Sequence, residues 1–330
     1  MPKPTFTMIA AAAGVGTATV ERVLNGRGGV RPGTALKVIR AARALDWPGR
    51  LPEAHRGILR IEVMLVRPET SFFARLAAAY RRIAATLDRS VQLHITFMDE
   101  ADPAAIARRI ARPEVSRAGL ILAAPAHPDV QAALGAAAGA GCPVVQVVTR
   151  VLPEAEFVAI NNYAAGRTAA HFLSRMCDRP GPVLALCHSA PYHVHRERLR
   201  GFSDCLAAQG RHTLVFAAFA NDDRDLAARR LRETLRDWPD LAGVYNVCAA
   251  NGAILDVLAK CRQHVFFVGH ELSQATEDAL RAGVADIVID QAPETQARRT
   301  IDIMLSRLGL TEMQIDNPPV RFLTITGENL

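Results

Sequence analysis

The sequence has little of what marks membrane, secreted or metal-binding proteins. None of its six cysteines stands in a C-x-x-C pair, so the spacing indicates neither a zinc ribbon nor a redox motif. Charged or strongly polar residues interrupt every apolar run well before 18 residues, which argues against a transmembrane helix. The start, Met-Pro-Lys-Pro, lacks the apolar stretch and cleavage site of a secretory signal. We therefore expect a cytoplasmic protein with reduced, mostly buried cysteines.

The chain also lacks the short motifs of common enzyme classes. It contains no G-x-S-x-G, no Walker phosphate loop and no G-x-G-x-x-G. His193-x-His195 is a candidate metal pair, but residues two apart share a face only in a strand, and the other histidines are distant in sequence. Asp222-Asp223 and Asp225 fit a helix start better than a calcium loop. We expect no enzymatic activity, no metal and no cofactor.

What is present is an ordinary globular composition with an uneven charge. At roughly 150 residues per domain, 330 residues predict two domains, with room for a small extra module. Residues 1–50 hold eight basic and two acidic side chains, a net charge of +6 that equals the charge of the whole chain, so the remaining 280 residues sum to zero. A basic head on a neutral body is typical of a nucleic-acid-binding module, although a solvated basic face gives the same count.

The basic head has the pattern of three short helices. Thr7 is placed to cap a helix over Met8–Ala12, and Gly16 or Thr17 to open a second that ends at Asn25-Gly26. Thr34 is placed to cap a third helix, which Trp47-Pro48 closes. The tight Gly14-Val15-Gly16 turn between the first two helices predicts a helix-turn-helix.

These residues resemble the headpiece of the lactose-repressor (LacI/GalR) family of bacterial transcription regulators. The match runs without a gap over Thr7, Ala10, Ala13-Gly14-Val15, Thr19-Val20, Arg22-Val23-Leu24-Asn25-Gly26, Val30, Thr34, Val38, Ala41 and Leu45. The resemblance implies that the second helix enters the major groove of DNA. It assigns the reading of base edges to Thr17, Ala18 and Arg22, and phosphate contacts to Thr7, Gly16, Thr19, Asn25, Arg31 and Thr34.

Two departures from the family pattern lie on the expected DNA face. Glu21 stands where the family usually has Ser, and a carboxylate there repels phosphate unless it accepts from cytosine or pairs with Arg22 or Arg27. Gly16 replaces the usual Ser and so loses a side-chain cap. The linker, residues 49–57, is a further departure. Pro52 can open a helix but Gly57 follows closely, so we expect a plain tether, with Leu51 as the alternative minor-groove wedge.

From Ile58 onward, buried apolar runs alternate with amphipathic segments. This alternation predicts parallel sheets with helices on both faces. Strands are predicted at Arg60–Val66, Val91–Phe97, Gly119–Ala124, Val144–Val148, Pro182–Cys187, Leu214–Phe219, Gly243–Val247, Val265–Gly269 and Asp286–Ile289. Helices are predicted at Ala74–Leu87, Ala104–Ala111, Ala164–Met176, Glu197–Gln209, Ala227–Trp238, Ala249–Lys260 and Thr295–Leu308.

The same family has a body of two lobes like those of periplasmic sugar-binding proteins. The resemblance implies a helix-turn-helix head over residues 1–48 and an α/β body over 58–330, built from two doubly wound parallel-sheet lobes. Lobe 1 would comprise about 58–161 and 292–318, and lobe 2 about 162–291 and 319–330. Ligands of such folds bind at the carboxyl ends of the strands, hence between the lobes.

The resemblance also implies which residues line this cleft. Ser71-Phe72-Phe73 resembles the family's aromatic pair, and Arg198 its ligand arginine within Arg-x-x-Gly-aromatic. Val247 replaces an aspartate that the family has beside Asn246, and Glu271 keeps a carboxylate in place of aspartate. An arginine, carboxylate, amides and rings suit a polyhydroxylated ligand. The candidate effector-binding residues are Ser71, Phe72, Phe73, Asn161, Arg198, Phe219, Asn246, Glu271 and Gln291.

We therefore expect a DNA-binding transcriptional regulator, a repressor in the commonest family pattern, whose operator affinity depends on a sugar or sugar-like effector. A homodimer, or a tetramer, would supply two heads for a near-palindromic operator. The alternative is a cytoplasmic sugar-binding protein whose head has lost DNA binding, which Glu21, Gly16 and the irregular linker favour.

Overall fold

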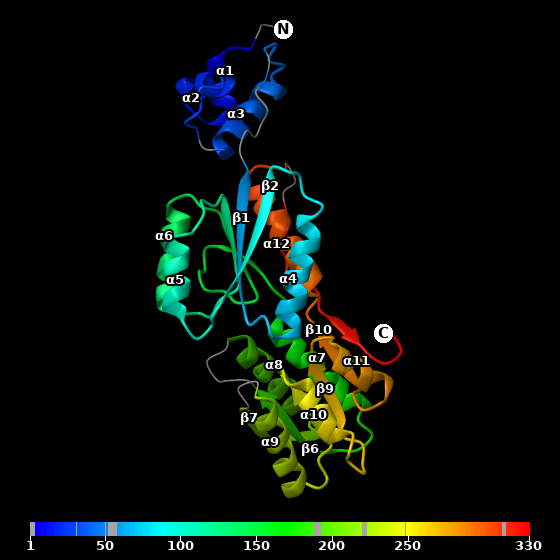
Figure 1. Ribbon diagram of the computed structural model, residues 1–330. Coiled ribbons are helices and arrows are strands. Elements are labelled where there is room, and N and C mark those ends of the chain that lie inside the picture. Colours follow the sequence, from blue (N-terminus) through cyan, green and yellow to red (C-terminus); the bar gives the residue numbers. More distant parts are fainter. Residues whose placement is uncertain are drawn as a thin grey trace.

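The protein has three bodies, which lie in a row: a small helical head, a first α/β lobe and a second α/β lobe (Figure 1). The computed structural model describes residues 4–30, 32–49, 51, 58–187, 193–219, 223–247, 249–311 and 315–330, with the backbone alone at 32, 36 and 216–219. Arg31 and most of the predicted linker, residues 52–57, lie outside the described residues.

The head consists of the helices α1 (Phe6–Ala13), α2 (Thr17–Leu24) and α3 (Pro32–Ala44). They enclose a small core that includes the fully buried Ile9, Val20 and Val38. Gly14 ends α1 in the left-handed conformation, with φ of 64°, which glycine adopts without strain and which turns the chain into α2. The predicted helix-turn-helix is therefore present.

Two predicted caps in the head are wrong. Thr5, not Thr7, has the extended backbone of an N-cap, and its hydroxyl accepts from Met8 N at 3.3 Å. Thr7 lies inside α1 and is exposed. The third helix begins at Pro32, whose missing N–H needs no partner in a first turn, so Thr34 is also inside its helix.

Lobe 1 is a parallel sheet with the strand order β2-β1-β3-β4-β5. Its strands are β1 (Leu59–Val66), β2 (Val91–Met98), β3 (Gly119–Leu122), β4 (Val144–Val147) and β5 (Glu156–Val158). Its helices are α4 (Ser71–Ala84), α5 (Pro103–Ala111), α6 (Pro128–Gly139) and α12 (Pro293–Arg307). Figure 1 shows α5 and α6 on one face and α4 and α12 on the other.

Alternation along β1 explains how both faces of this sheet are covered. Ile61, Val63 and Leu65 join the core cluster that contains residues of α4 and α12. Met64 and Val66 join the separate cluster beneath α5 and α6. A strand buried on both faces reads as an apolar run, and residues 63–66 of β1 form such a run, which is why β1 is evident in the sequence.

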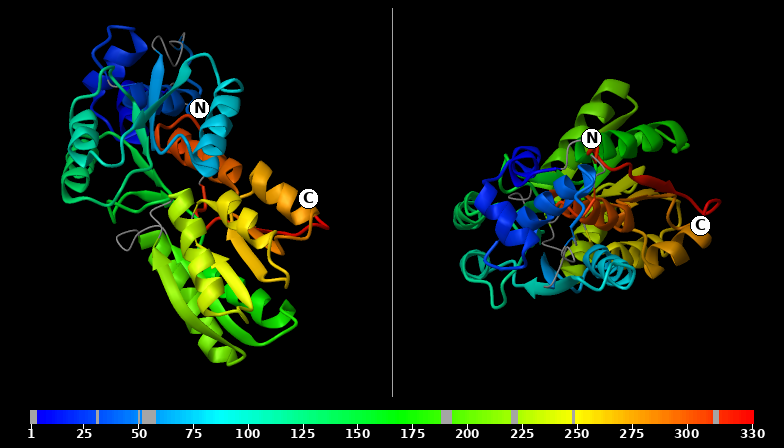
Figure 2. Two further views of the ribbon diagram at one scale, coloured as in Figure 1. Left: turned by 60° about the horizontal axis from the view of Figure 1, so that its bottom comes forward. Right: turned by 90° about the horizontal axis from the view of Figure 1, so that it is seen from above.

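Lobe 2 has the strand order β11-β10-β9-β8-β6-β7. Its strands are β6 (Gly181–Cys187), β7 (His212–Phe219), β8 (Gly243–Asn246), β9 (Phe266–His270), β10 (Ile287–Asp290) and β11 (Leu323–Ile325). Its helices are α7 (Asn162–Met176), α8 (His193–Gln209), α9 (Arg224–Asp237), α10 (Asn251–Leu258) and α11 (Gln274–Arg281). β11 pairs antiparallel with β10, so the chain ends on lobe 2 (Figure 2).

The predicted fold class, a helical head with two doubly wound lobes, is confirmed, with differences in detail. The helices α6 and α11 and the three-residue strands β5 and β11 lie outside the predicted elements. α4 begins at Ser71, three residues before the predicted start, because Thr70 is already the extended residue before the helix. The lobes meet where Ile160 bridges Val320 and where the chain passes from Asp290 into α12.

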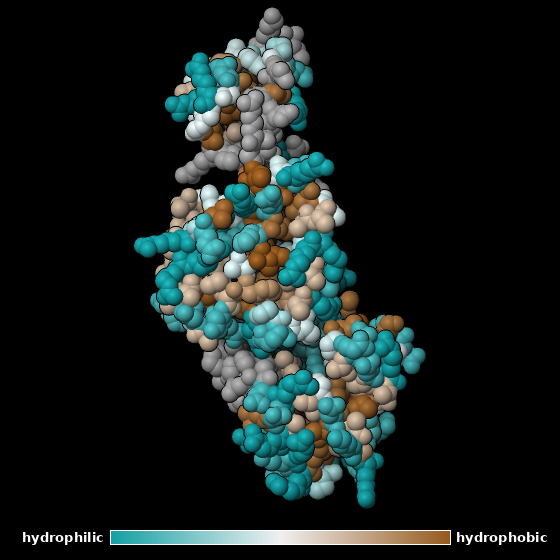
Figure 3. Space-filling model, viewed as in Figure 1, coloured by the Kyte–Doolittle hydropathy of each residue, from teal (hydrophilic) through white to brown (hydrophobic). Residues whose placement is uncertain are grey.

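Polar side chains cover most of the face of both lobes shown in Figure 3. Among the described residues, no helix is long and apolar enough to cross a membrane.

Candidate functional site

The exposed side of α2 is the candidate DNA interface. Val20 and Val23 face the core of the head, whereas Thr17, Ala18 and Arg22 are exposed. The predicted phosphate-contacting residues Gly16 and Asn25 are also exposed, and Thr19 and Thr34 are half-buried. An exposed helix with short side chains at its N-terminal end and one arginine fits a major groove.

Glu21, the acidic departure on this helix, forms an ion pair. Its Oε1 lies 3.1 Å from Arg27 Nη1, and both side chains are exposed. A carboxylate at this position repels phosphate unless it accepts a hydrogen bond from cytosine or pairs with an arginine. The pair with Arg27 meets the second condition. An exposed pair stabilises the head by only about 0–1 kcal/mol, so Arg27 is easily drawn away to a phosphate. Gly16 is the N-cap residue of α2 and makes no side-chain hydrogen bond there, because glycine has no side chain.

The second candidate site is a cavity of about 400 Å³ between the two lobes. Its walls are chain segments that leave the carboxyl ends of the strands, beginning with Val66-Arg67 after β1 and His270-Glu271 at the end of β9. Parallel α/β sheets bind ligands at this edge because the strand ends and the starts of the helices converge there. Both lobes contribute, so a ligand in the cavity touches both.

Six of the nine predicted effector-binding residues line this cavity: Ser71, Phe72, Phe73, Arg198, Glu271 and Gln291. Asn161 does not line it, because its side chain accepts from Ala164 N at 2.9 Å and caps α7. Asn246 is buried and donates to Ala249 O at 2.9 Å and Asn251 Oδ1 at 2.6 Å, so it holds the β8–α10 loop. The side chain of Phe219 lies outside what the structure describes.

The aromatic pair Phe72 and Phe73 belongs both to the core of lobe 1 and to the wall of the cavity. Phe72 is 5% exposed, and its ring stands edge-on to that of Phe73 with centroids 5.2 Å apart. Both rings pack on the core of lobe 1 and line the cavity. Their place in the first turn of α4, and not at a strand end, fixes them as an apolar wall.

A close crossing of two helices positions Arg198. A Cβ at Gly166 of α7 would collide with Arg198 O, and one at Gly201 of α8 with Tyr163 O, so only glycine allows the two backbones to approach so far. Arg198 is 3% exposed; its Nε donates to Asn162 Oδ1 at 2.8 Å and its Nη1 to Val247 O at 2.9 Å. The guanidinium is thereby fixed in the cavity wall before any ligand arrives.

Glu271 is a buried carboxyl with one occupied oxygen. Gln291 donates to its Oε1, while its Oε2 has no hydrogen-bond partner among the described residues. Burial, together with the nearby charge of Asp290, raises the pKa of Glu271 to about 7. Near neutral pH this side chain can therefore accept a hydrogen bond or donate one.

His270, which precedes Glu271, is fully buried. Its Nε2 lies 2.8 Å from the Tyr245 hydroxyl, and its Nδ1 has no partner among the described residues. Burial, with the nearby positive charge of Arg198, lowers the pKa of His270 well below its ordinary value, so the ring is neutral.

Left-handed backbone gathers around this cavity. Six described non-glycine residues have positive φ, and four of them, Arg67, Val148, Ala250 and Glu271, line the cavity, with φ between 54° and 72°. A fifth, Ala292, follows Gln291 directly. Such conformations cost roughly 1–3 kcal/mol each and tend to occur at binding sites, where they aim side chains that a relaxed chain would not.

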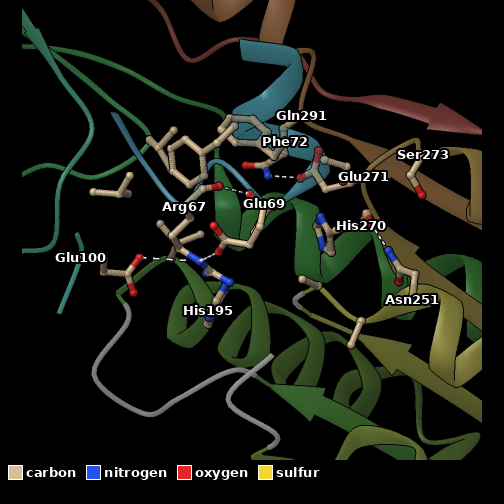
Figure 4. A pocket seen from close by; sticks show the side chains of 18 of the residues that line it. Arg67, Glu69, Phe72, Glu100, His195, Asn251, His270, Glu271, Ser273 and Gln291 are labelled. Carbon is tan, nitrogen blue, oxygen red and sulfur yellow. Dashed lines mark hydrogen bonds and ion pairs between the residues drawn. The ribbon is translucent and has the colours of Figure 1, made fainter. Parts of the chain in front are cut away.

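Several polar residues of the cavity were not predicted. Arg67 lies 3.7 Å from both Glu69 Oε1 and Glu100 Oε2, and this group forms the polar wall of lobe 1 (Figure 4). Lobe 2 adds His195, Arg224 and Asn251. Arg67, Glu69 and Glu100 lie one to three residues after predicted strands, which is the signal that would have found them. Nothing in the sequence singles out Arg224. Among the described residues no three metal-binding side chains cluster.

Comparison with protein families identifies both parts of the chain. Residues 61–310 match the periplasmic binding protein domain, and residues 5–48 match the bacterial regulatory proteins of the lacI family. The first match spans more than half of the chain, so the chain belongs to the periplasmic binding protein domain family, and the second match assigns its head to the lacI family. Its head carries that family's DNA-binding domain, and its two lobes are a periplasmic binding protein domain. No curated protein matches the chain.

Solved structures share the fold of the two-lobed body. A periplasmic solute-binding protein of an ABC transporter from Actinobacillus succinogenes, with bound D-allose, has a TM-score of 0.72 at 16% identity and covers 82% of this chain and 98% of its own. A solute-binding protein from Burkholderia graminis in complex with D-arabinose gives 0.73 at 17%, covering 83% and 97%. GanP, a glucose-galactose binding protein from Geobacillus stearothermophilus, gives 0.71 at 17%, covering 84% and 99%.

Proposed function

We propose that this lacI-family protein is a transcriptional repressor whose operator affinity is set by a sugar or sugar-like effector in the cavity between the lobes. The observation that carries the proposal is the cavity itself. Arg198, Glu271 and Gln291 supply donors and acceptors suited to hydroxyl groups, and Phe72 and Phe73 supply an apolar wall. The structural relatives that hold D-allose and D-arabinose in the same fold support this class of ligand.

Helix α12 is the physical link between this cavity and the head. It begins at Pro293, two residues after the cavity residue Gln291, and ends at Arg307. Directly beyond its end, Gly309 lies beside α3 of the head: a Cβ placed on Gly309 would be 3.9 Å from Arg40 Nη1. A ligand that draws the lobes together shifts α12 and with it the head, and this difference between states changes DNA affinity.

Two heads are needed for a near-palindromic operator, so the active form is a homodimer, and two dimers form a tetramer if they associate further. Each head contributes one α2 to one half-site. Arg22 can bridge O6 and N7 of a guanine with two hydrogen bonds, which accounts for roughly 1–3 kcal/mol of discrimination.

The test is a gel shift with DNA from upstream of the protein's own gene, with and without a panel of sugars. Arg22→Ala should weaken binding to cognate DNA by about 1–3 kcal/mol and remove most of the preference for one base at one base pair. Binding to random DNA should change little. Arg229→Ala on α9 is the matched control, because this arginine is exposed on lobe 2.

The outcomes separate the candidate functions. Release of DNA by a sugar supports an induced repressor, and tighter binding indicates corepression instead. Sugar binding without any specific DNA binding would favour the alternative, a sugar-binding protein with an inactive head, for which Gly16 and Glu21 are the arguments. If Arg22→Ala weakens binding to cognate and random DNA equally, Arg22 contacts a phosphate and does not read a base.

A further inference from the structure

The two walls of the interlobe cavity differ in charge. Among the described lining residues of lobe 1 the one cation, Arg67, lies 3.7 Å from each of two carboxylates, Glu69 and Glu100, so this described part of the wall is net negative. On lobe 2, the described lining residues include the arginines Arg198 and Arg224 against one carboxyl. An effector that spans the cavity therefore meets opposite fields at its two ends.

The start of α10 collects hydrogen-bond donors on the positive wall. The residue before this helix, Ala250, offers no side-chain cap, so the first-turn N–H groups of α10 have no acceptor from it. Residues 249–252 line the cavity, and the positive end of the helix dipole lies there.

Arg224 lies against this same turn. A Cβ placed on Gly252, in the first turn of α10, would be 3.6 Å from Arg224 Nη2. Because Gly252 carries no side chain, nothing at that position separates the guanidinium from the helix start. Arg224 follows the cap of α9, Asp223, whose carboxylate is engaged with Leu226 N at 2.9 Å.

A buried side chain next to this turn independently indicates a ligand. Asn251 Nδ2 donates to His270 O at 2.6 Å, which fixes His270 beside the start of α10, and the His270 ring lines the cavity (Figure 4). His270 is fully buried, and its Nδ1 has no partner among the described residues. When the Tyr245 hydroxyl donates to Nε2, Nδ1 carries the proton and is a donor.

We propose that the effector is an acidic sugar, whose carboxylate or phosphate group binds on lobe 2 between Arg224 and the start of α10. Its hydroxyl groups then face Glu69 and Glu100 of lobe 1 across the rings of Phe72 and Phe73. This inference rests on the proposed function, because it assigns the ligand class of the same cavity. Arg224 contributes charge, the helix start contributes N–H donors, and His270 Nδ1 contributes a neutral donor.

The experiment is calorimetric titration of the full chain, at constant ionic strength, with neutral and acidic partners: D-glucose, D-gluconate and D-glucose 6-phosphate, and D-galactose, D-galactonate and D-galacturonate. We expect at least one acid to bind about tenfold or more tightly than its neutral partner. Preference for the aldonates or uronate identifies a carboxylate, and preference for the sugar phosphate identifies a phosphate.

Variants then test the assigned place. Arg224→Gln should abolish the preference for the acid, Arg224→Lys should keep part of it, and Arg229→Gln, an exposed arginine on the same helix, should leave it intact. Neutral sugars that bind as tightly as their acids would overturn this inference and leave the proposed function standing. An acid preference that survives in Arg224→Gln overturns the site on α10. Failure of every sugar in the panel to bind would overturn both proposals.

Discussion

At the scale of the residue, Glu271 combines a backbone constraint with an electrostatic one. Its φ of 72° is in the left-handed region, which a non-glycine residue adopts only when its surroundings hold it there. Its neighbours Gln291 and Asp290 come from the crossover between the lobes, one as a hydrogen-bond donor and one as a like charge. The hydrogen bonding and charge of Glu271, which would bind a ligand hydroxyl, therefore depend on the position of that crossover.

Glu271 should make stability fall as pH rises through the weakly acidic range. Its folded-state pKa of about 7 exceeds the ordinary value of 4.5, so the folded chain holds this proton more tightly than the unfolded chain. The stabilisation is complete below about pH 4.5 and is lost by about pH 7, a change of about 3 kcal/mol. Urea unfolding of the wild type and Glu271→Gln at pH 5 and 8 measures it. If both chains change in parallel, Glu271 titrates normally.

At the scale of the element, the α7–α8 crossing decides where the arginine of the cavity lies. Both helices are recognisable in the sequence, and so is the glycine of Arg198-Leu199-Arg200-Gly201-Phe202. Gly166 and Gly201 are 35 positions apart in the chain. The close contact between the helix faces that carry them appears only in the folded protein. The same holds for α10, whose open start becomes a possible anion site only because Arg224 of α9 packs beside it.

Gly201→Ala should destabilise the protein by about 1–3 kcal/mol, because the added methyl group overlaps Tyr163 O and neither backbone can yield cheaply. The variant should also lose ligand affinity, since Arg198 moves with α8. Gly135→Ala is the matched control. It lies inside α6 with nothing within 4 Å of its Cβ, so it should stabilise by about 0.5–1 kcal/mol. Urea unfolding checks both, and an unchanged Gly201→Ala would show that the helices can separate.

At the scale of the whole molecule, Arg75 joins the lobes beside the cavity. Arg75 of α4, in lobe 1, donates to Leu272 O of lobe 2 at 3.2 Å and pairs with Asp290 at the crossover. It also pairs with Glu294 of α12 at 2.9 Å. Asp290 is 2% exposed, so its charge depends on this partner and on the N–H groups of Leu272 and Ala292.

Arg75→Met should lower the free energy of unfolding by about 3 kcal/mol, because it leaves the buried Asp290 without its cation. Arg82→Met is the control on the same helix: that side chain is 64% exposed and lies 3.9 Å from Glu294, so its loss should cost less than about 1 kcal/mol. Adding Asp290→Asn to Arg75→Met should recover part of the loss. Equal effects of Arg75→Met and Arg82→Met in denaturant titrations would exclude a buried pair.

The amino-acid sequence by itself determined the family resemblance, the order of most of the elements and six of the nine predicted residues that line the cavity. Those features depend on local rules: the apolar run that ends β1, the end of α1 at Gly14, and signature residues such as Arg198 three positions before Gly201. Helix starts were less secure, as Thr7 and Thr34 show, because several neighbouring residues can cap equally well and the packing of the head chooses among them. Asn246 ends β8 and Asn161 directly precedes α7; both were expected in the cavity, but a local loop and a helix cap use their amides.

Only the tertiary structure decided the chemistry that the cavity presents. Arg67 beside Glu100, Arg224 beside α10, and the Glu271 oxygen and His270 nitrogen that have no partner among the described residues all depend on contacts between segments distant in the chain. The pKa of Glu271 follows from burial and from the charge of Asp290, neither of which a linear pattern contains. Periodicity fixes which face of an element is apolar, whereas charge and hydrogen bonding in a cavity depend on which ends of which elements meet there.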